Sequence, residues 1–322
     1  MRKIVTIIFL MSVAAPHLLA AHRLIGSTGE QLLNVAVDAR SSGMGRAFAA
    51  VGEDTSAVFY NPAGLGALYH SELAGSKSFW FEDINHTYAG FAYNLHDVRT
   101  SNIVELGTVY AGIMTLDASG IVTSTAAASA FAPKDQVIYL AYGKPVFERE
   151  DAGSITAGIA VKFYKEEEGA VKSEGQAFDA GALWNAADKS FSAGISVQNI
   201  GDPIRHAGAD VELPLNVKTG VAARFLDNRL LAAFDVNTPR TGEAVFNVGG
   251  EWWFLQAMAL RAGYDSRTGQ ASGVSAGLGI RLQQVDVPLM YAHELTIDYS
   301  VTPYGDKGNV HRLGLGLKFG AE

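Results

Sequence analysis

Residues 215–225, LNVKTGVAARF, decide the fold. Apolar side chains stand at 215, 217, 221, 223 and 225, and polar or small ones stand at 216, 218, 220 and 224. A period of two places alternate residues on opposite faces of a β-strand. About ten such residues suffice to cross a membrane as a tilted strand. The stretch is therefore predicted to be a spanning strand with one apolar and one polar face.

The same alternation recurs from residue 70 to Phe319, interrupted by turn-forming residues. We predict fourteen strands, at 70–81, 85–95, 103–116, 136–144, 154–165, 174–185, 190–199, 215–225, 229–237, 244–254, 257–264, 272–282, 289–302 and 309–319. Bacterial outer-membrane barrels have an even number of antiparallel strands. The predicted fold class is all-β, a transmembrane antiparallel β-barrel over 70–319.

The second face of these strands consists largely of Gly, Ala and Ser with isolated charges. Such small inward residues imply that something else fills the lumen. The charges are Lys162, Asp179, Lys218, Arg224, Glu251, Arg261, Arg281 and Asp298. Because both signs occur, a mutually neutralising network is favoured over an ion-selective ring.

A secreted soluble β protein would also alternate, so the connections provide a second test. Outer-membrane barrels have short periplasmic turns and longer outer loops. The long connections after odd-numbered strands are 117–135, 166–173 and 200–214, and the short ones after even-numbered strands are 186–189, 226–228 and 255–256. The connection 145–153 is long on the wrong side. Aromatic runs such as Trp252-Trp253-Phe254 favour girdles at the membrane interfaces, with ordinary core packing as the alternative.

The first 21 residues have the layout of a secretory signal peptide. Arg2 and Lys3 precede an apolar stretch, and Leu19-Ala20-Ala21 is a small-residue cleavage site. Cleavage before His22 followed by insertion places the mature chain in the bacterial outer membrane. A retained anchor is the weaker alternative, because Pro16 interrupts a segment that is already short for a span.

Composition excludes several other functions. The chain carries 25 Lys and Arg against 33 Asp and Glu, with no basic run, so no nucleic-acid partner is expected. It has no Cys, which removes disulfides, thiolate metal sites and cysteine nucleophiles. The histidines show no metal-ligand spacing, and neither a cofactor nor a metal site is predicted. His293, Asp298 and Ser300 could form an inter-strand triad, but three unrelated wall residues are the better interpretation, so the protein is predicted not to be an enzyme.

Residues 22–69 do not alternate, and they are predicted to form short helices and tight turns. Gly43 and Gly45 suggest positions of positive φ or close approach, and Asn61-Pro62 suggests a turn or a helix start. About fifty compact residues before a barrel lined with glycine can serve as a plug. Residues 22–69 are therefore predicted to be an N-terminal hatch in the lumen.

Two stretches resemble a known family. Residues 39–66, ARSSGMGRAFAAVGEDTSAVFYNPAGLG, are similar to the N-terminal signature of the PorV/PorQ group, in the superfamily of FadL-like outer-membrane proteins. Residues 295–319, LTIDYSVTPYGDKGNVHRLGLGLKF, resemble the last hairpin of that group. The resemblance implies a fourteen-strand barrel with an N-terminal hatch. Phe319 is followed by Gly320-Ala321-Glu322, whereas many outer-membrane chains end on the aromatic residue.

The resemblance implies two functions. The first is FadL-like binding and passage of hydrophobic small molecules such as a fatty acid, with outer-membrane lipids as surroundings. The alternative is a PorV-like accessory barrel of the type IX secretion system, which docks cargo or translocon proteins through loops such as 118–132. The candidate hatch or ligand-gating residues are Arg40, Gly43, Met44, Gly45, Asn61, Pro62 and Gly64, and the hairpin motif comprises Pro303, Tyr304, Gly305, Asp306, His311 and Arg312.

Overall fold

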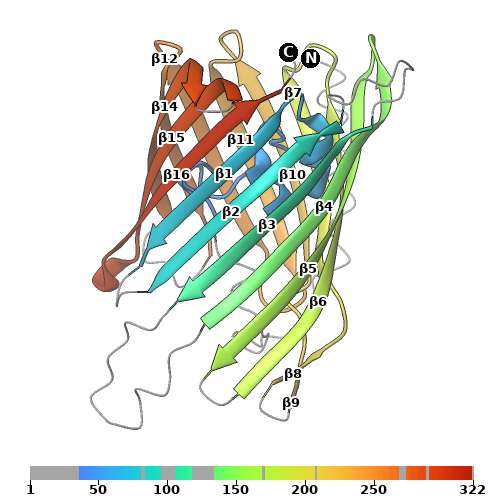
Figure 1. The fold of residues 1–322 in the computed structure, drawn as a ribbon, viewed down its shortest axis with the longest axis vertical. Helices are drawn as coiled ribbons and strands as arrows, with labels where there is room; N and C mark the ends of the chain where they lie inside the picture. Colours follow the sequence, from blue (N-terminus) through green and yellow to red (C-terminus); the bar gives the residue numbers. More distant parts are fainter. Residues whose placement is uncertain are drawn as a thin grey trace.

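The computed structural model describes residues 36–80, 84–95, 106–117, 134–168, 171–206, 209–267, 273–287 and 290–320. Its main feature is a closed barrel of antiparallel strands (Figure 1). Within these ranges, no helix is long and apolar enough to cross a membrane. The predicted signal peptide and the loop 118–132 lie outside the described residues.

Fourteen strands form the barrel, which confirms the predicted number and class. They are β1 Ser71–Phe79, β2 Asn85–Asn94, β3 Thr108–Asp117, β4 Lys134–Arg149, β5 Gly153–Glu168, β6 Val171–Asn185, β7 Phe191–Ile200, β10 Asn216–Phe225, β11 Leu230–Pro239, β12 Val245–Phe254, β13 Met258–Asp265, β14 Val274–Val287, β15 Met290–Pro303 and β16 Asn309–Phe319. Each strand pairs with its neighbour along the chain, and β1 pairs with β16 to close the barrel.

Two connections differ from the expectation. The segment predicted as a loop at 166–173 is mostly strand, since β5 continues to Glu168 and β6 begins at Val171. The turn placed at 145–153 shrinks to 150–152, which removes the long connection on the wrong side. Strands can extend past the membrane into water, where backbone pairing needs no apolar face. A prediction from the alternation of apolar and polar residues therefore made these strands too short. The connection 201–215 holds a small hairpin, β8 Ile204–His206 and β9 Ala209–Val211.

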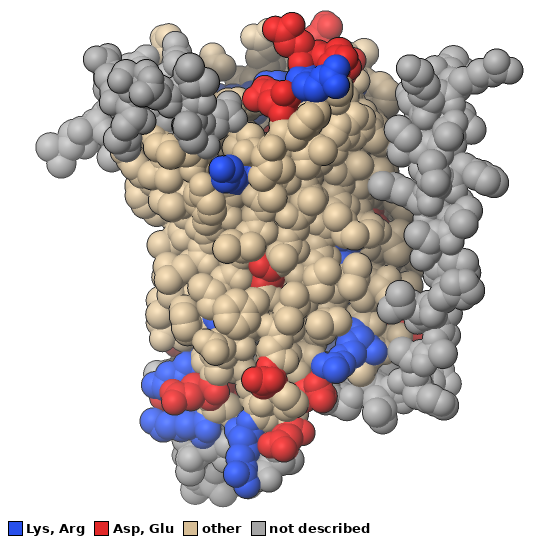
Figure 2. All heavy atoms as spheres, turned by 90° about the vertical axis from the view of Figure 1, so that its right-hand side faces the viewer, with Lys and Arg blue, Asp and Glu red and all other residues tan. Residues whose placement is uncertain are grey.

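The outer face of the barrel is apolar. Ile159 is 62% exposed and Leu315 59% exposed, although both stand in regular mid-barrel strands. Figure 2 shows Lys, Arg, Asp and Glu gathered toward the two ends, with a nearly uncharged band between them. A protein that exposes such a band in water would be unusual, whereas lipid tails match it.

Alternation also decides which aromatic residues can reach the lipid. Trp252 is 46% exposed on the outer face and fits a girdle. Its neighbour Trp253 points inward, is 8% exposed and has the guanidinium of Arg281 3.8 Å from its ring centroid. The expected girdle is therefore wrong for Trp253, because two adjacent strand residues cannot face the same side.

Candidate functional site

Residues 36–70, called the lumenal segment below, lie inside the barrel (Figure 1). Met44, Phe48 and Leu65 of this segment are completely buried. It contains one short α-helix, α2 Ala39–Gly43, and two 3-10 helices, η2 Thr55–Phe59 and η3 Pro62–Ala67. The segment is the only source of helical structure in the described lumen, since the remaining described helix, η7 Gly305–Lys307, lies at a hairpin tip.

Each short helix starts on a side-chain cap. Asp38 accepts a hydrogen bond from the backbone N–H of Ser41 at 2.8 Å, and Asp54 accepts one from Ser56 at 3.0 Å. Asn61 caps η3 with Pro62 in its first turn. These residues satisfy N–H groups that a helix start leaves open, and proline has no N–H to satisfy there. The predicted helix start at Asn61-Pro62 is confirmed.

Polar side chains of the wall satisfy the rest of the segment's backbone. Asp235 of β11 accepts hydrogen bonds from the N–H groups of Phe48 and Ala49, at 2.7 and 2.8 Å. Wall side chains donate to carbonyls of the segment at Gly45 (from Asn247), Ala50 (from Ser192), Phe59 (from Gln198), Tyr60 (from Ser196) and Ala63 (from Thr156). These contacts come from several strands around the barrel, so the segment is held from several sides.

Glycines let the segment approach the wall. Gly45 has a φ of 60°, and a Cβ built on it would lie 2.4 Å from the backbone nitrogen of Tyr264. A Cβ on Gly158 of β5 would lie 2.3 Å from the backbone carbonyl of Pro62. Any other residue would collide at either place. Small residues on both the segment and the wall therefore allow this close approach.

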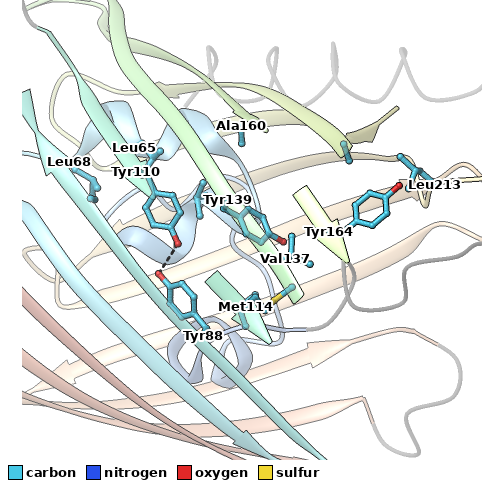
Figure 3. Close-up of a cluster of buried hydrophobic side chains, with 14 of the residues drawn as sticks. Leu65, Leu68, Tyr88, Tyr110, Met114, Val137, Tyr139, Ala160, Tyr164 and Leu213 are labelled. Atoms are coloured by element: carbon cyan, nitrogen blue, oxygen red, sulfur yellow. Dashed lines mark hydrogen bonds between the residues drawn. The ribbon is translucent and has the colours of Figure 1, made fainter. Parts of the chain in front are cut away.

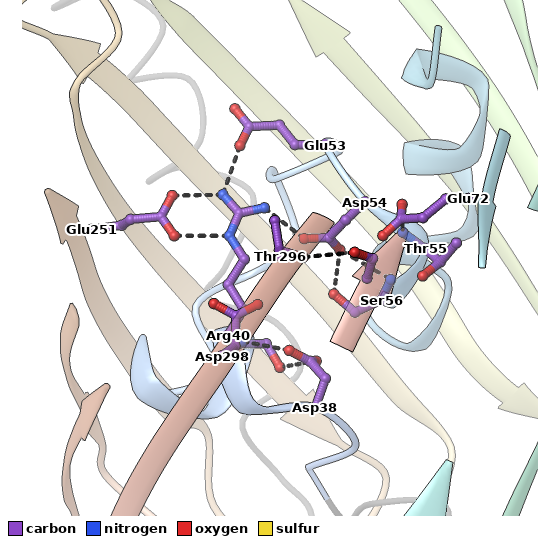
Figure 4. A network of polar contacts seen from close by, with 12 residues as sticks. Asp38, Arg40, Glu53, Asp54, Thr55, Ser56, Glu72, Glu251, Thr296 and Asp298 are labelled. Carbon is purple, nitrogen blue, oxygen red and sulfur yellow. Dashed lines mark hydrogen bonds and ion pairs between the residues drawn. The ribbon is translucent and has the colours of Figure 1, made fainter. Parts of the chain in front are cut away.

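Arg40 is the centre of a network of ion pairs (Figure 4). Its guanidinium donates to both carboxylate oxygens of Glu251 on β12, at 2.7 and 2.9 Å. It also donates to Asp54 at 2.6 Å and to Glu53 at 2.7 Å. A planar guanidinium with five donors is well suited to hold several carboxylates at once. One arginine therefore joins two acids of its own segment to one acid of the wall.

The network continues into the wall on both sides. Arg261 of β13 bridges Glu251 and Asp298, each at 2.6 Å. On the other side Arg224 of β10 donates to Glu53 at 2.6 Å. The name Arg40 network is used for Arg40, Glu53, Asp54, Arg224, Glu251, Arg261 and Asp298. The mutual neutralisation expected from the sequence is confirmed for these residues.

Two carboxyl groups of the lumenal segment have pKa values shifted in opposite directions. Burial opposes a charge on Glu53, but the guanidinium groups of Arg40 and Arg224 outweigh it and lower the pKa of Glu53 to about 2. Burial raises the pKa of Asp38 to about 6, and the neighbouring carboxylate of Asp54 adds to this effect. Glu53 therefore stays ionised at neutral pH, whereas Asp38 titrates only about one pH unit below neutrality.

The segment meets an aromatic region on its other side (Figure 3). Phe59 packs edge-on against three inward tyrosines, with centroid distances of 5.0 Å to Tyr88, 6.4 Å to Tyr110 and 4.8 Å to Tyr139. Met114 and other buried apolar side chains complete the cluster. Phe59 thus joins the segment to strands β2, β3 and β4.

The segment is bordered by open space at the rim of the barrel where β1 begins and β16 ends. A cavity of about 800 Å³ there is lined by residues that include Glu53, Tyr69, Lys189 and Arg224. Glu53 is 37% exposed in its side chain, whereas Glu251 is 2% exposed. The Arg40 network therefore lies between solvent on one side and the closed interior on the other.

The predicted hatch residues share the lumenal segment, but they have different tasks. Arg40 carries ion pairs, Asn61 donates to the carbonyls of Ala49 and Ala182, and Gly45 makes the closest backbone approach. Gly43 lies against Gly277 of β14, Gly64 packs within the segment, and Met44 is buried. A role in gating is not visible in these contacts and stays a prediction.

The hairpin motif is not part of the same site. Gly305 and Asp306 lie at the exposed tip. His311 faces outward and contacts the hydroxyl of Tyr299 at 2.7 Å, whereas Arg312 points inward and donates to Thr302 at 3.1 Å. Adjacent strand residues face opposite sides, so His311 lies on the outer face of the barrel and Arg312 on the inner face. His293 contacts the Gly320 carbonyl, and Asp298 binds Arg261, so no Ser-His-Asp arrangement forms.

Sequence reasoning missed several partners of the segment. Glu53 and Asp54 stood in the quoted signature without an assigned role, and Asp235 and Asn247 were not singled out. Alternation places Asp235 and Asn247 on the inward face, so their direction could have been found. Their partners could not, because no local pattern says which part of the segment a wall residue meets.

Comparisons with known proteins bear on the fold. No protein-family model and no curated protein matches the sequence. Among solved structures, the chain is similar to a TodX deltaS2S3 mutant, a monoaromatic hydrocarbon channel, with TM-score 0.56 and 13% identity over 88% of this chain and 99% of that one. The Ralstonia pickettii toluene transporter TbuX gives TM-score 0.54 and 12% identity over 92% and 98%. The monoaromatic hydrocarbon channel CymD gives 0.51 and 12% over 88% and 97%. The chain therefore has the barrel fold that these channels share.

Proposed function

We propose that the protein is an outer-membrane channel that binds hydrophobic small molecules and lets them pass. The observation that carries the proposal is the lumenal segment, which fills the barrel and is held by contacts that can be broken and remade. The fold shared with TodX, TbuX and CymD, named for hydrocarbon passage, supports it. The apolar outer band and the aromatic cluster around Phe59 supply surfaces that suit an apolar solute.

A filled lumen predicts selectivity against polar solutes. A water-filled pore would conduct sugars, whereas a barrel closed by the lumenal segment excludes them until the segment moves. The solute then enters from the end that bears the long loops and leaves through the cavity of about 800 Å³ beside Glu53. The Arg40 network holds the segment during the resting state.

The test measures the entry of solutes into lipid vesicles whose membrane contains the purified protein. Toluene and arabinose serve as the apolar and polar probes. We expect the protein to raise toluene entry severalfold over empty vesicles and to leave arabinose entry unchanged. Entry of arabinose at the rate of an open pore, or no effect on toluene, would contradict the proposal.

The PorV-like secretion role is the second candidate, and the filled lumen is compatible with it, because a docking barrel needs no open channel. The resemblance to the PorV/PorQ group rests on the two stretches 39–66 and 295–319. The two roles separate in a pull-down of the detergent-extracted protein with mass spectrometry of bound proteins and lipids. Secretion components without enriched apolar molecules would favour docking, whereas a stoichiometric apolar molecule without a protein partner would favour passage.

A further inference from the structure

A polar patch interrupts the apolar outer face of the barrel on three strands that lie side by side, β1, β16 and β15 (Figure 1). The strand registers place Lys77 and Tyr299 opposite the outward-facing Leu313, and they place Phe79 opposite His311. Residues that stand opposite each other in a sheet share one face. The name outer patch is used below for Lys77, Phe79, Tyr299 and His311.

The outer patch lies at the border of the apolar band. Along β16, His311 is followed on the same face by Leu313 and Leu315, which are 50% and 59% exposed. β1 ends at Phe79, and at the same end of the barrel β3 ends at Asp117, before the long connection to β4. Outer loops of such barrels are long and periplasmic turns are short. The patch is therefore at the outer border, where lipid tails give way to lipid head groups.

Lys77 is an exposed cation that makes no ion pair with any described residue. Its Nζ instead lies 5.3 Å from the ring centroid of Phe79, two residues closer to the outer end of β1, so its side chain runs along the strand toward the head groups. Long cationic side chains near a membrane border extend in this way to reach the polar layer. Two other exposed lysines at the outer end, Lys165 and Lys172, both pair with Glu167. Lys77 is thus a cation that can take a negatively charged lipid group.

His311 adds a hydrogen-bond donor beside the lysine. Its Nδ1 lies 2.7 Å from the hydroxyl of Tyr299, and the two rings stack with centroids 6.0 Å apart. A neutral imidazole that accepts from the tyrosine hydroxyl at Nδ1 carries its proton on Nε2, which has no hydrogen bond among the described residues. Lys77 and His311 are diagonal neighbours on adjacent strands, a spacing of about 7–8 Å that long side chains can bridge. Nζ and Nε2 can therefore meet at one acceptor group.

Apolar surface continues from the patch along the same strands. Leu73 of β1 is 49% exposed and Phe91 of β2 is 39% exposed. Phe91 stacks with Phe319 of β16, with centroids 6.1 Å apart. Acyl chains can lie along this surface while their head group stands at the outer patch. The arrangement suits a lipid that carries its negative charge close to its acyl chains.

We propose that the outer patch binds a phosphate group of a phosphorylated glycolipid in the outer leaflet, with Lys77 as its cation and His311 as a hydrogen-bond donor. Glycolipids of this kind form the outer leaflet of bacterial outer membranes. A phosphate monoester carries up to two negative charges and three acceptor oxygens, so it can engage both side chains at once. The phosphodiester of a phospholipid carries one charge and suits the pair less well. The patch faces lipid and not the lumen, so this inference is independent of the proposed function.

Binding of three lipids to the purified full chain in detergent, followed by native mass spectrometry, tests the site. The probes are lipid A with its phosphates, the same lipid A after the phosphates are removed, and phosphatidylglycerol. We expect the wild type to bind phosphorylated lipid A about tenfold more tightly than either of the other lipids. Equal binding of the dephosphorylated form would overturn the proposal. Equal binding of phosphatidylglycerol would overturn the assignment to a glycolipid, because any anionic lipid would then suffice.

Three variants locate the phosphate. Lys77→Met is expected to weaken phosphorylated lipid A about fivefold, the factor for one lysine at an anionic lipid surface. Lys77→Met combined with His311→Phe, which keeps a ring beside Tyr299, is expected to reduce the preference for the phosphorylated form to less than about twofold. Lys172→Met is the matched control, because Lys172 is also exposed at the outer end but pairs with Glu167 at 3.2 Å, and it should keep the full preference.

Heat-dependent migration in gels checks that each variant folds, and outward Met and Phe suit contact with lipid. A folded double variant that keeps the preference for phosphorylated lipid A would overturn the site. If the double variant does not fold, Lys77→Met alone decides, since an unchanged preference there would overturn the site as well. Toluene entry into vesicles is expected to be the same in all variants, so the lipid site and the proposed function can fail separately.

Discussion

On the side of the lumenal segment that faces β12, Arg40 has three carboxylates within 2.9 Å, whereas on the side that faces β10, Lys218 has none within ion-pairing distance among the described residues. On the first side guanidinium groups bond every carboxylate of the Arg40 network and fix the segment there. On the second side the carboxylate that acts most strongly on Lys218 is that of Asp235, which lies beyond ion-pairing distance. One segment thus has a holding side around Arg40 and a Lys218 side, and direct ion pairing distinguishes them.

Removing Arg40 is expected to have the largest effect on the holding side. Arg40→Met leaves Asp54 without its cation. Glu53 and Glu251 each keep one guanidinium, from Arg224 and Arg261. A buried pair broken on one side costs about 3–5 kcal/mol. We expect the segment to leave the wall, with faster amide exchange at Phe48 and Ala49 and faster toluene entry into vesicles. Arg149→Met is the control, because Arg149 pairs with Asp151 in solvent at exposures of 60% and 69%. Equal exchange in both variants would remove the Arg40 network as the holding device.

Gly45→Val tests the backbone approach on the same segment. A valine there meets both an unfavourable φ of 60° and a clash at 2.4 Å with Tyr264, and we expect a loss of about 3 kcal/mol in the free energy of unfolding. Gly242→Val is matched, since Gly242 has a φ of 100° but nothing within 4 Å of its Cβ position. Urea unfolding in detergent compares the two. Unchanged heat stability and permeability of Gly45→Val would refute the hatch.

The same substitution, Glu to Gln, at one buried and one partly exposed position tests how burial sets the strength of the network. Glu251→Gln removes a charge that is 2% exposed and accepts from Arg40 and Arg261, so a loss of about 2 kcal/mol is expected. Glu53→Gln alters a carboxylate that is 37% exposed, where water screens the pair, so we expect about 0.5 kcal/mol. The same urea series measures both. A larger loss for Glu53→Gln would mean that the network is held from its solvent side.

Mild acid is expected to leave the holding side intact. The pKa of Glu53 is lowered from 4.5 to about 2, so its contribution to stability is full above pH 4.5 and is lost as the pH falls toward 2. The pKa of Asp38 is raised to about 6, so its protonation slightly favours the folded form as the pH falls from 7 through 6. Toluene entry should thus change little from pH 7 to 5 and rise toward pH 2. A rise already at pH 5 would contradict this assignment.

Lys218→Met is expected to have the smallest effect on stability. Lys218 has no ion pair to lose, so the free energy of unfolding should change by less than about 1 kcal/mol. Lys162→Met is the matched control, since Lys162 is also buried but pairs with Asp179 at 2.8 Å, and it should cost about 3 kcal/mol. Similar losses in both variants would mean that the lack of a direct ion pair does not distinguish Lys218 from Lys162.

Much of the fold could be predicted from local pattern. The alternation in 215–225 placed Lys218 and Arg224 on the inner face, as the structure confirms. The same rule could not say that Arg224 meets Glu53 while Lys218 meets no carboxylate. The strands β10 and β11 were predicted within a few residues, but the ends of β5 and β6 were not, because a strand that continues into water loses its apolar face. The positive φ at Arg46 had no signal, since only glycine was considered for such a position.

By itself, the sequence determined the strands, the faces and the need for a filled lumen, because a period of two fixes the direction of every side chain before any partner is known. Only the tertiary structure decided which charges are matched. Arg40 and Glu251 are 211 positions apart, and closing the barrel around the segment brings them together. Ion pairing depends on such distances in space, so the holding side and the Lys218 side differ only once the chain is folded.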